Sequence, residues 1–211
     1  MKNEYSETPT SLKKMVFYGF SWIDFVTSIP SPLFVVTTYK SNGKPNACYH
    51  SFGTFAGTNE NDFFCIMAYV NKNGHMYKSI KETNEMVINF PSKEIHQKCY
   101  NTIKNNGFEL DEITESGLTV EKATSVNAPR IKECFLNLEC EYSWEKDLMI
   151  NGNFVVMCVK VKNIAMNKEH FDEKSKGRYG ETGYIFNLHN PTNPETGLEE
   201  GGPIGIIKKI L

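Results

Sequence analysis

The sequence lacks the residue patterns that most often assign a chemistry directly. Its six cysteines include no Cys-x-x-Cys pair, whereas structural zinc and iron–sulfur sites use such closely spaced ligands. The Gly-x-Gly-x-x-Gly, P-loop, His-Glu-x-x-His and Gly-x-Ser-x-Gly motifs are missing, and the five histidines show no i, i+4 pairing. We therefore expect no metal site, no dinucleotide-binding or P-loop fold and no serine-hydrolase site.

Strong charge and long apolar runs are missing as well. The 211 residues carry a formal net charge of −2, with lysine and arginine spread along the chain, so no nucleic-acid partner is expected. No segment approaches the roughly 20 apolar residues of a membrane-spanning helix, and the first residues show no charged-then-apolar leader pattern. We expect no membrane association and a cytoplasmic protein with reduced thiols.

Hydrophobic residues make up 40% and charged residues 23% of the chain, which is typical of a globular domain with a sizeable core. Short runs rich in β-branched and aromatic residues predict six strands. These are Leu33–Tyr39, Asn46–Phe52, Asp62–Val70, Glu85–Phe90, Phe135–Trp144 and Phe154–Ile164. The run 62–70 is continuously apolar, which predicts burial on both faces, whereas strict alternation in 135–144 predicts one solvated face.

Helices are predicted over 74–83 and 92–104, the second with Ser92 as N-cap, and a shorter one near 110–116. The strands follow one another mostly in hairpin order, and alternating βαβ units are missing. The pattern predicts a mainly β fold, a Greek-key barrel of about six strands with inserted helices. It divides the chain into a lead-in (1–28), the barrel domain (29–168) and an irregular C-terminal extension (169–211), whose apolar end is expected to pack on a partner subunit.

Several residues have a structural and a functional interpretation. The aromatic segment Met15–Phe25 is either packed across the barrel or a subunit contact, or else forms a lid over a flat ligand. Cys65 and Cys158 are expected to be small buried hydrophobes. His96 is expected on the solvated side of its helix, and His170 and His189 lie in predicted loops, where a catalytic role is the less expected alternative.

Two polar stretches around an apolar strand form the candidate site. Residues 44–55 leave a tight turn as a strand and end in small and hydroxyl residues, which can present N–H groups to an anion. Asn71, Lys72 and His75 precede or open a predicted helix, whose unpaired N–H groups attract anions. An ordinary capped helix with a solvated lysine is the alternative for this second stretch.

Residues from about 30 to 164 resemble the flavin reductase-like family, the FMN-binding split barrels that include flavoredoxins. The resemblance rests on the order and spacing of several short segments together, none of them diagnostic alone. They are Pro32–Thr38, Gly43–Ala47, His50–Phe52, Asn71–His75, Tyr77–Thr83, Met86–Pro91, Leu138–Cys140 and the strand around Val155–Val161.

The resemblance implies a homodimer with one FMN held noncovalently per subunit, reduced by NADH or NADPH. Hydride would arrive at flavin N5, so no catalytic side chain is assigned. The residues that would line the flavin belong to one segment: Asn46, Ala47, Cys48, Tyr49, His50, Ser51, Phe52 and Thr54. The phosphate would be held by Asn71, Lys72 and His75. His50 is a conceivable donor to the flavin, although its ring could equally face the core.

Two alternatives to an NAD(P)H-dependent flavin reductase stay open. One is a flavoredoxin-like electron carrier that binds FMN but does not oxidise NAD(P)H efficiently. The other is a split barrel without enzymatic activity that binds a different ligand or partner. This last alternative is favoured by Met76, because family members often carry serine or threonine at that position.

Overall fold

The computed structural model describes residues 2, 4–14, 22–58, 62–189, 196–198 and 203–208, without the side chains of 24–26. Most of the predicted aromatic lid (15–21, and the side chains of 24–26) and the last three residues of the apolar C-terminus therefore lie outside the described residues. The chain divides into two compact units, one formed by 1–31 and 186–205, the other by 32–185 and 206–211. Residues 169–185, which the sequence assigns to the C-terminal extension, fall in the second unit.

The second unit contains a seven-stranded sheet in which every pairing is antiparallel. Its order is β3-β2-β6-β9-β10-β5-β4. All six predicted strands are present, so the mainly β fold is confirmed; in this sheet, β4 is the strand that the sequence did not reveal. The bounds are β2 Phe34–Tyr39, β3 Pro45–His50, β4 Gly53–Gly57, β5 Phe63–Asn71, β6 Glu85–Phe90, β9 Leu136–Asp147 and β10 Phe154–Met166.

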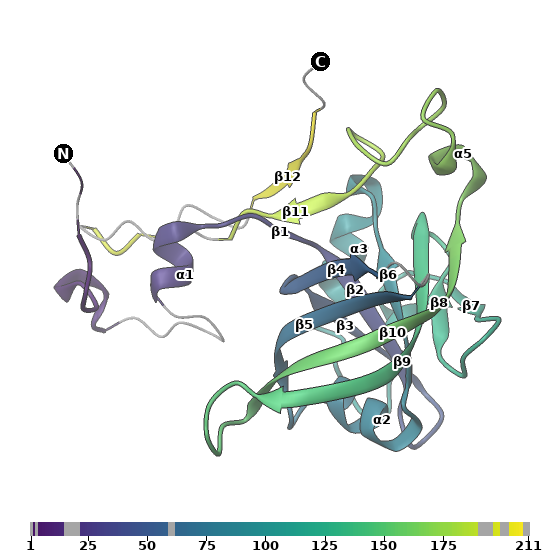
Figure 1. Cartoon of the computed structure of the whole chain (residues 1–211), viewed down its shortest axis with the longest axis horizontal. Helices are drawn as coiled ribbons and strands as arrows, with labels where there is room; N and C mark the ends of the chain where they lie inside the picture. Colours follow the sequence, from purple (N-terminus) through teal and green to yellow (C-terminus); the bar gives the residue numbers. More distant parts are fainter. Residues whose placement is uncertain are drawn as a thin grey trace. The chain divides into compact units, whose positions relative to one another are not determined.

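The sheet is rolled so that its two edge strands come together. β3 and β4 lie at opposite ends of the strand order, yet only Ser51 and Phe52 separate them in the chain. So short a connection spans about 10 Å at most, which brings the two edges close together. The Phe52 carbonyl accepts a hydrogen bond from the Ala68 N–H of β5 at 2.9 Å. Figure 1 shows the strands of this unit curving around a common core.

The seam where these two edges meet runs from Ser51 to Thr54. Its residue 53 is glycine because a side chain there would collide with the core. An ideal Cβ would lie 2.8 Å from Cε1 and Cζ of Phe34. The Phe34 ring is fully buried and is held by His50, Phe55 and Phe90 at centroid distances of 5.4, 5.9 and 5.8 Å. It therefore has little room to move aside.

Gly53→Ala is expected to lower the free energy of unfolding by about 1–3 kcal/mol, the usual cost of overpacking a core. Chemical denaturation measures it. Gly57→Ala, at the other end of β4, is the matched control, because its Cβ would meet only ordinary contacts at 3.6 Å or more. Equal stability of the two variants would contradict the assigned packing.

Helix α2 (His75–Thr83) covers the core on one side of the sheet and matches its predicted bounds. Met76 and Ile80, one turn apart, are buried in the core cluster that also holds Phe34, Val36 and Met86. Asn84 ends the helix in the left-handed conformation at φ 59°. Cys65 and Cys158 are buried, as predicted.

The opposite side of β2 and β3 is covered by short elements between β6 and β9. They build a second core cluster around Val35, Ala47, Cys99 and Ile113. The elements are η2 Lys93–Ile95, α3 His96–Asn101, α4 Glu112–Glu115, β7 Val120–Lys122 and β8 Pro129–Ile131. The predicted short helix near 110–116 is thus confirmed.

The predicted helix 92–104 is only partly correct. It begins as a 3₁₀ turn, the α-helical part covers 96–101, and Ser92 makes no side-chain cap. Of the predicted apolar stripe, Cys99 is fully buried but Ile103 is 51% exposed. A short stripe of this kind gives too little buried surface to support four helical turns.

Two burial predictions for strands are wrong. In β9 the polar residues Asn137 and Glu139 are buried rather than solvated, because the segment carrying Thr124, Ser125 and Arg130 bonds to Glu139. In β5 only Cys65, Met67 and Val70 are buried, and the remaining residues are half-buried or exposed.

Residues that follow β10 also pack on this unit. The imidazole of His170, in α5 (Lys168–Phe171), stacks on Phe135 at 4.6 Å and donates a hydrogen bond from Nε2 to the Thr182 carbonyl. Burial and these contacts give His170 a structural role. The remaining elements are η1 Thr10–Leu12, α1 Trp22–Thr27, β1 Ser31–Pro32, β11 Ile185–Asn187 and β12 Ile204–Ile206.

Candidate functional site

The candidate site is built on β3, an edge strand that pairs with β2. The Ala47 N–H points off this edge and donates to Glu112 Oε2 at 2.9 Å. Backbone groups of an antiparallel edge strand alternate in direction, so the N–H of Tyr49 faces the same way. Glu112 takes the Ala47 donor, so the Tyr49 N–H is the further backbone donor that points off this edge.

One face of β3 is anchored in the second core cluster. The Tyr49 side chain lies against it, and its hydroxyl is 2.7 Å from His96 Nδ1. Burial, with Cys99 and Cys134 nearby, raises the pKa of Tyr49, and burial lowers the pKa of His96. The neutral phenol thus donates to a neutral imidazole. The predicted solvated position of His96 is wrong, because this hydrogen bond turns its ring toward β3.

The other face of β3 carries Asn46 and Cys48. Asn46 pairs directly with Thr38 of β2, so both side chains lie on the same face. Both residues are buried, and Thr38 Oγ1 and Asn46 Nδ2 have no hydrogen-bond partner among the described residues. A buried polar group without a partner is costly. Burial, with Glu112 second, raises the pKa of Cys48 to about 12, so its thiol stays protonated.

His50 lies in the core rather than at the strand edge. Its Nε2–H donates to the Ala68 carbonyl at 3.0 Å, and its ring meets Phe34 edge-on. Burial lowers the pKa of His50 to about 4, against the smaller opposing effect of backbone hydrogen bonds. It is therefore neutral at neutral pH. Of the two orientations that the sequence left open, the structure has the inward one.

At the seam, Ser51 is buried, Phe52 is half-buried and Thr54 is exposed. The Phe52 ring lies 6.1 Å from that of Tyr69, which stacks on Phe154 at 4.2 Å. Tyr69 adopts a positive φ of 63°, uncommon for a residue other than glycine. These rings form an aromatic surface next to the end of β3.

The segment from Asn71 to His75 forms a tight turn into α2. Asn71 accepts the Asn73 N–H through its side chain at 2.9 Å and the Gly74 N–H through its carbonyl at 3.0 Å. Gly74 is the N-cap, and no side chain of the described residues caps the helix. The first N–H groups of α2 are therefore without side-chain partners, an arrangement that favours an anion.

Lys72 already has an anionic neighbour in this arrangement. Its Nζ lies 2.7 Å from Asp147 Oδ1, with both side chains partly exposed. Its backbone N–H donates to the Asn153 carbonyl, which holds the turn against the β9–β10 hairpin. Met76 is 5% exposed and faces the core, so it neither offers nor blocks a contact at the turn.

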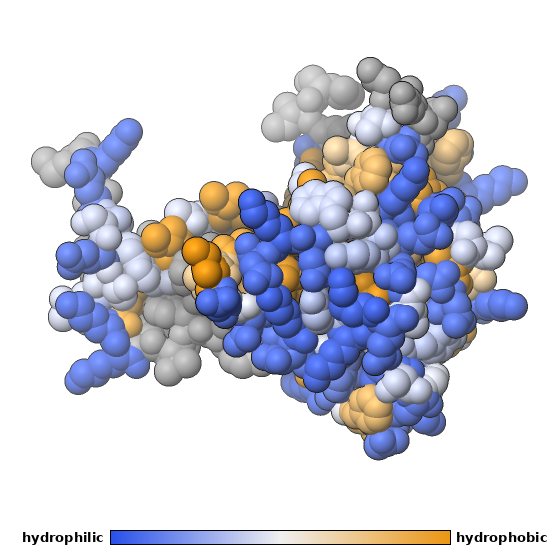
Figure 2. Space-filling model, turned by 60° about the horizontal axis from the view of Figure 1, so that its bottom comes forward, coloured by the Kyte–Doolittle hydropathy of each residue, from blue (hydrophilic) through white to orange (hydrophobic). Residues whose placement is uncertain are grey.

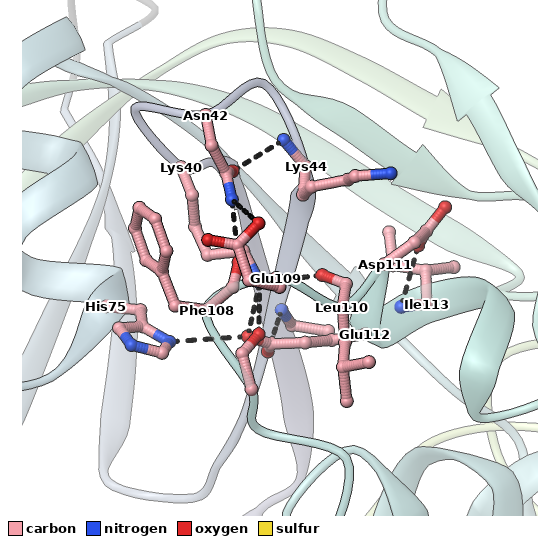
Figure 3. Close-up of polar contacts among 12 residues, drawn as sticks. Lys40, Asn42, Lys44, His75, Phe108, Glu109, Leu110, Asp111, Glu112 and Ile113 are labelled. Carbon is pink, nitrogen blue, oxygen red and sulfur yellow. Dashed lines mark hydrogen bonds and ion pairs between the residues drawn. The ribbon is translucent and has the colours of Figure 1, made fainter.

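The two predicted stretches meet at Glu112, which the sequence did not single out (Figure 3). Its carboxylate accepts the Ala47 N–H through Oε2, while Lys40 Nζ and His75 Nδ1 lie 2.9 and 3.4 Å from Oε1. The Phe108 ring packs edge-on against His75. β3 and the start of α2 therefore share one buried anion.

Among the described residues no three or more His, Cys, Asp or Glu side chains are grouped as metal ligands. No helix in the part of the chain that the structure describes is long and apolar enough to cross a membrane.

A family model described as "Flavin reductase like domain" matches residues 26–183. The chain belongs to the flavin reductase-like family. The resemblance drawn from the sequence is thereby confirmed, and the family supports a flavin-linked oxidoreductase.

The chain is also similar to individual relatives and solved structures. An uncharacterized protein of Aquifex aeolicus is 30% identical over 117 residues, which cover 54% of this chain and 59% of that protein. In structure, the chain resembles nitrilotriacetate monooxygenase component B from Bacillus cereus, with a TM-score of 0.72, 16% identity and 90% of each chain covered. It also resembles flavoredoxin of Desulfovibrio vulgaris, with a TM-score of 0.65, 15% identity, and 86% and 89% covered. At these identities the likeness shows the fold, the split barrel.

The residues present fit a flavin mononucleotide. Asn46 Nδ2 and the Thr38 hydroxyl are polar groups that need partners, and Tyr49 presents a backbone N–H at the edge of β3. At the start of α2, N–H groups without a side-chain cap lie near Lys72 and His75, and a phosphate accepts hydrogen bonds from donors of these kinds. The nearby aromatic rings supply apolar surface.

Proposed function

We propose that this protein is an FMN-binding oxidoreductase that takes reducing equivalents from NADH or NADPH and passes them to free flavin or another acceptor. The observation that carries the proposal is the convergence of β3 and the start of α2 on Glu112. Beside it, a buried polar pair on β2 and β3 has no partner among the described residues. Family membership supports the flavin-linked part of the proposal.

Each predicted residue has a place in this proposal. Asn71, Lys72 and His75 would hold the phosphate, with the N–H groups at the start of α2. Within the segment from Asn46 to His50, the backbone groups that point off the edge of β3 would face the polar rim of the ring, and the seam residues Ser51, Phe52 and Thr54 would continue that wall. The flavin, when bound, supplies the redox chemistry.

The protein groups near β3 are unsuited to nucleophilic or acid–base chemistry of their own. The Cys48 thiol stays protonated because burial raises its pKa to about 12. The His50 imidazole is neutral, with its pKa lowered to about 4 and its Nε2–H engaged by Ala68. The states of these two groups support the interpretation that the protein binds and orients a cofactor and does not form a covalent intermediate itself.

The test is an absorbance spectrum of the full chain reconstituted with FMN, taken before and after anaerobic addition of NADH or NADPH. Bound flavin that bleaches within seconds is the expected result. Flavin that persists with both nicotinamides would indicate the flavoredoxin-like electron carrier that the sequence left open. No uptake of FMN would overturn the proposal in favour of a split barrel that binds another ligand or partner.

We also propose that the protein is a homodimer. The β9–β10 hairpin exposes Trp144, Met149 and Ile150 at 47%, 63% and 95%, and such clustered apolar exposure often marks an interface. Figure 2 shows hydrophobic patches (orange) on an otherwise mostly hydrophilic face. Light scattering after size exclusion should give twice the chain mass of 24.1 kDa. A species of single-chain mass at micromolar concentration would contradict it.

A further inference from the structure

The Lys40–Glu112 pair is a buried ion pair with every donor and acceptor engaged. The side chains of both residues are 1% exposed. Lys40 Nζ donates to the carbonyls of Gly107 and Leu110 at 2.7 and 2.8 Å and to Glu112 Oε1 at 2.9 Å. Glu112 Oε2 takes the Ala47 N–H. The pair thus fixes the 107–112 segment and the carboxylate against the edge of β3.

This carboxylate determines which nitrogen of His75 carries a proton. His75 Nδ1 lies 3.4 Å from Glu112 Oε1, and an ionised carboxylate only accepts hydrogen bonds. Nδ1 must therefore be the protonated nitrogen. The side chain is 25% exposed, and Nε2 lies on the side of the ring away from Glu112 (Figure 3).

The chemistry of Nε2 then depends on the charge of the ring. In the neutral imidazole with Nδ1–H, Nε2 is an acceptor and repels a phosphate oxygen. Only the imidazolium donates from both nitrogens, to Glu112 and to the phosphate at once. Because Lys40 offsets the charge of Glu112, the charge that balances the imidazolium comes from the phosphate.

We propose that Glu112 is a positioning residue that holds His75 by Nδ1, and that FMN binding therefore adds one proton to His75. This inference rests on the proposed function, because it places the FMN phosphate at the start of α2. The proton comes from solvent and goes to Nε2, which then donates to a phosphate oxygen.

The other charged groups near the His75 imidazole do not account for the proton that is taken up. On the packed 107–112 segment, Glu109 lies near Asn42, and Asp111 caps α4. On the turn and helix that carry His75, Lys72 is paired with Asp147, and Lys78 is exposed. A lysine ammonium has no site for a further proton, so neither lysine can take up a proton when FMN binds.

The test is titration calorimetry of the full chain at pH 8 in buffers of different ionisation enthalpy, with FMN and with riboflavin. The second phosphate pKa is about 6, so the phosphate is already a dianion and a proton taken up belongs to the protein. One proton is expected for FMN and none for riboflavin, which lacks the phosphate. In the same range the FMN Kd should rise about tenfold per pH unit.

His75→Gln keeps a hydrogen-bond donor but cannot be protonated. It should bind FMN about tenfold more weakly at pH 7, with no proton uptake and no pH dependence, while riboflavin binding is unchanged. His170→Gln, in the histidine stacked on Phe135, is the matched control and should keep the uptake of one proton.

The role of Glu112 is tested by the double variant Lys40→Met, Glu112→Leu, which removes both buried charges together. Once circular dichroism confirms that it folds, its binding of FMN should no longer take up one proton, because neutral His75 is then free to carry its proton on Nε2 and to donate it to the phosphate. Were it unable to fold, His75→Gln would still decide the proton linkage.

The outcomes separate the inference from the proposed function. FMN binding without proton uptake, or equal uptake with riboflavin, overturns the inference and leaves the proposed function standing. A double variant that still takes up one proton when it binds FMN overturns the role of Glu112. Failure of the wild-type protein to bind either flavin overturns the proposed function and the inference with it.

Discussion

Replacing Arg130 with methionine is expected to lower the free energy of unfolding by about 3–5 kcal/mol, the usual cost of removing one partner of a buried ion pair. The Glu139 side chain is fully buried, and Arg130 Nε donates to its Oε1 at 2.7 Å. The same carboxylate accepts the N–H groups of Thr124 and Ser125 at 2.9 and 2.6 Å. Without the guanidinium, a carboxylate is left in the core without its counter-charge.

Urea denaturation of the wild-type protein and of Arg130→Met at neutral pH measures the effect. Lys162→Met is the matched control, because its 3.1 Å ion pair with Glu141, between β10 and β9, is 40% and 45% exposed. Exposed pairs contribute under about 1 kcal/mol. If Arg130→Met lowered the free energy of unfolding as little as the control does, the buried cluster of Glu139 and its partners would not stabilise the fold.

The same cluster predicts how stability depends on pH. Burial alone would raise the pKa of Glu139, but hydrogen bonds from Ser125, Thr124 and Arg130 outweigh it and lower the pKa to about 2 from 4.5. A lowered pKa in the folded state stabilises the protein above pH 4.5, and this contribution is lost as pH falls toward 2. The Arg130→Met penalty should therefore shrink over that range.

Much of the fold could be predicted from the sequence because its signals are local. The six strands have runs of β-branched and aromatic residues, and α2 has apolar residues one turn apart. The strand β4 was missed because Gly53-Thr-Phe-Ala-Gly57 is short and begins and ends with glycine, which is depleted in strands. It is a strand because the seam places it beside β5.

The errors in burial have a different origin, contacts distant in sequence. Alternation in β9 predicts a solvated face, but nothing local reveals that the segment around Arg130 folds over Glu139. His96 was placed in solvent by the periodicity of its own helix, although its partner Tyr49 lies 47 residues away. Local pattern gives the side on which a residue lies, and not what covers that side.

The same limit applies to the candidate site. Asn71, Lys72 and His75 could be proposed from one short segment because the start of a helix has a recognisable anion-binding character. Glu112 and Lys40 could not, because they are 72 residues apart and Glu112 lies in a stretch of mixed pattern. Each looks like an ordinary surface charge until the fold brings the two into one buried pair.

Lys72→Ala is expected to weaken FMN binding about ten- to a hundredfold. A hydrogen bond to a charged group contributes roughly 1.5–3 kcal/mol, and each 1.4 kcal/mol is a factor of ten in Kd. Lys72 supplies the permanent positive charge at the turn before α2, since His75 is charged only when protonated. Fluorescence quenching of FMN measures the affinity, and unchanged binding would contradict the phosphate assignment.

The ion pair between Lys72 and Asp147 allows a sharper form of this experiment. Asp147 lies 2.7 Å from the ammonium, so it competes with a phosphate for the same charge, and Asp147→Asn should tighten FMN binding severalfold. In the Lys72→Ala background the same substitution should have a smaller effect, because the charge for which they compete is gone. Lys160→Met, which breaks a similar 2.6 Å pair with Asp62, changes the net charge equally and should leave FMN affinity unchanged. Equal effects of Lys72→Ala and Lys160→Met would mean that the phosphate responds only to overall charge, and that the turn before α2 does not hold it.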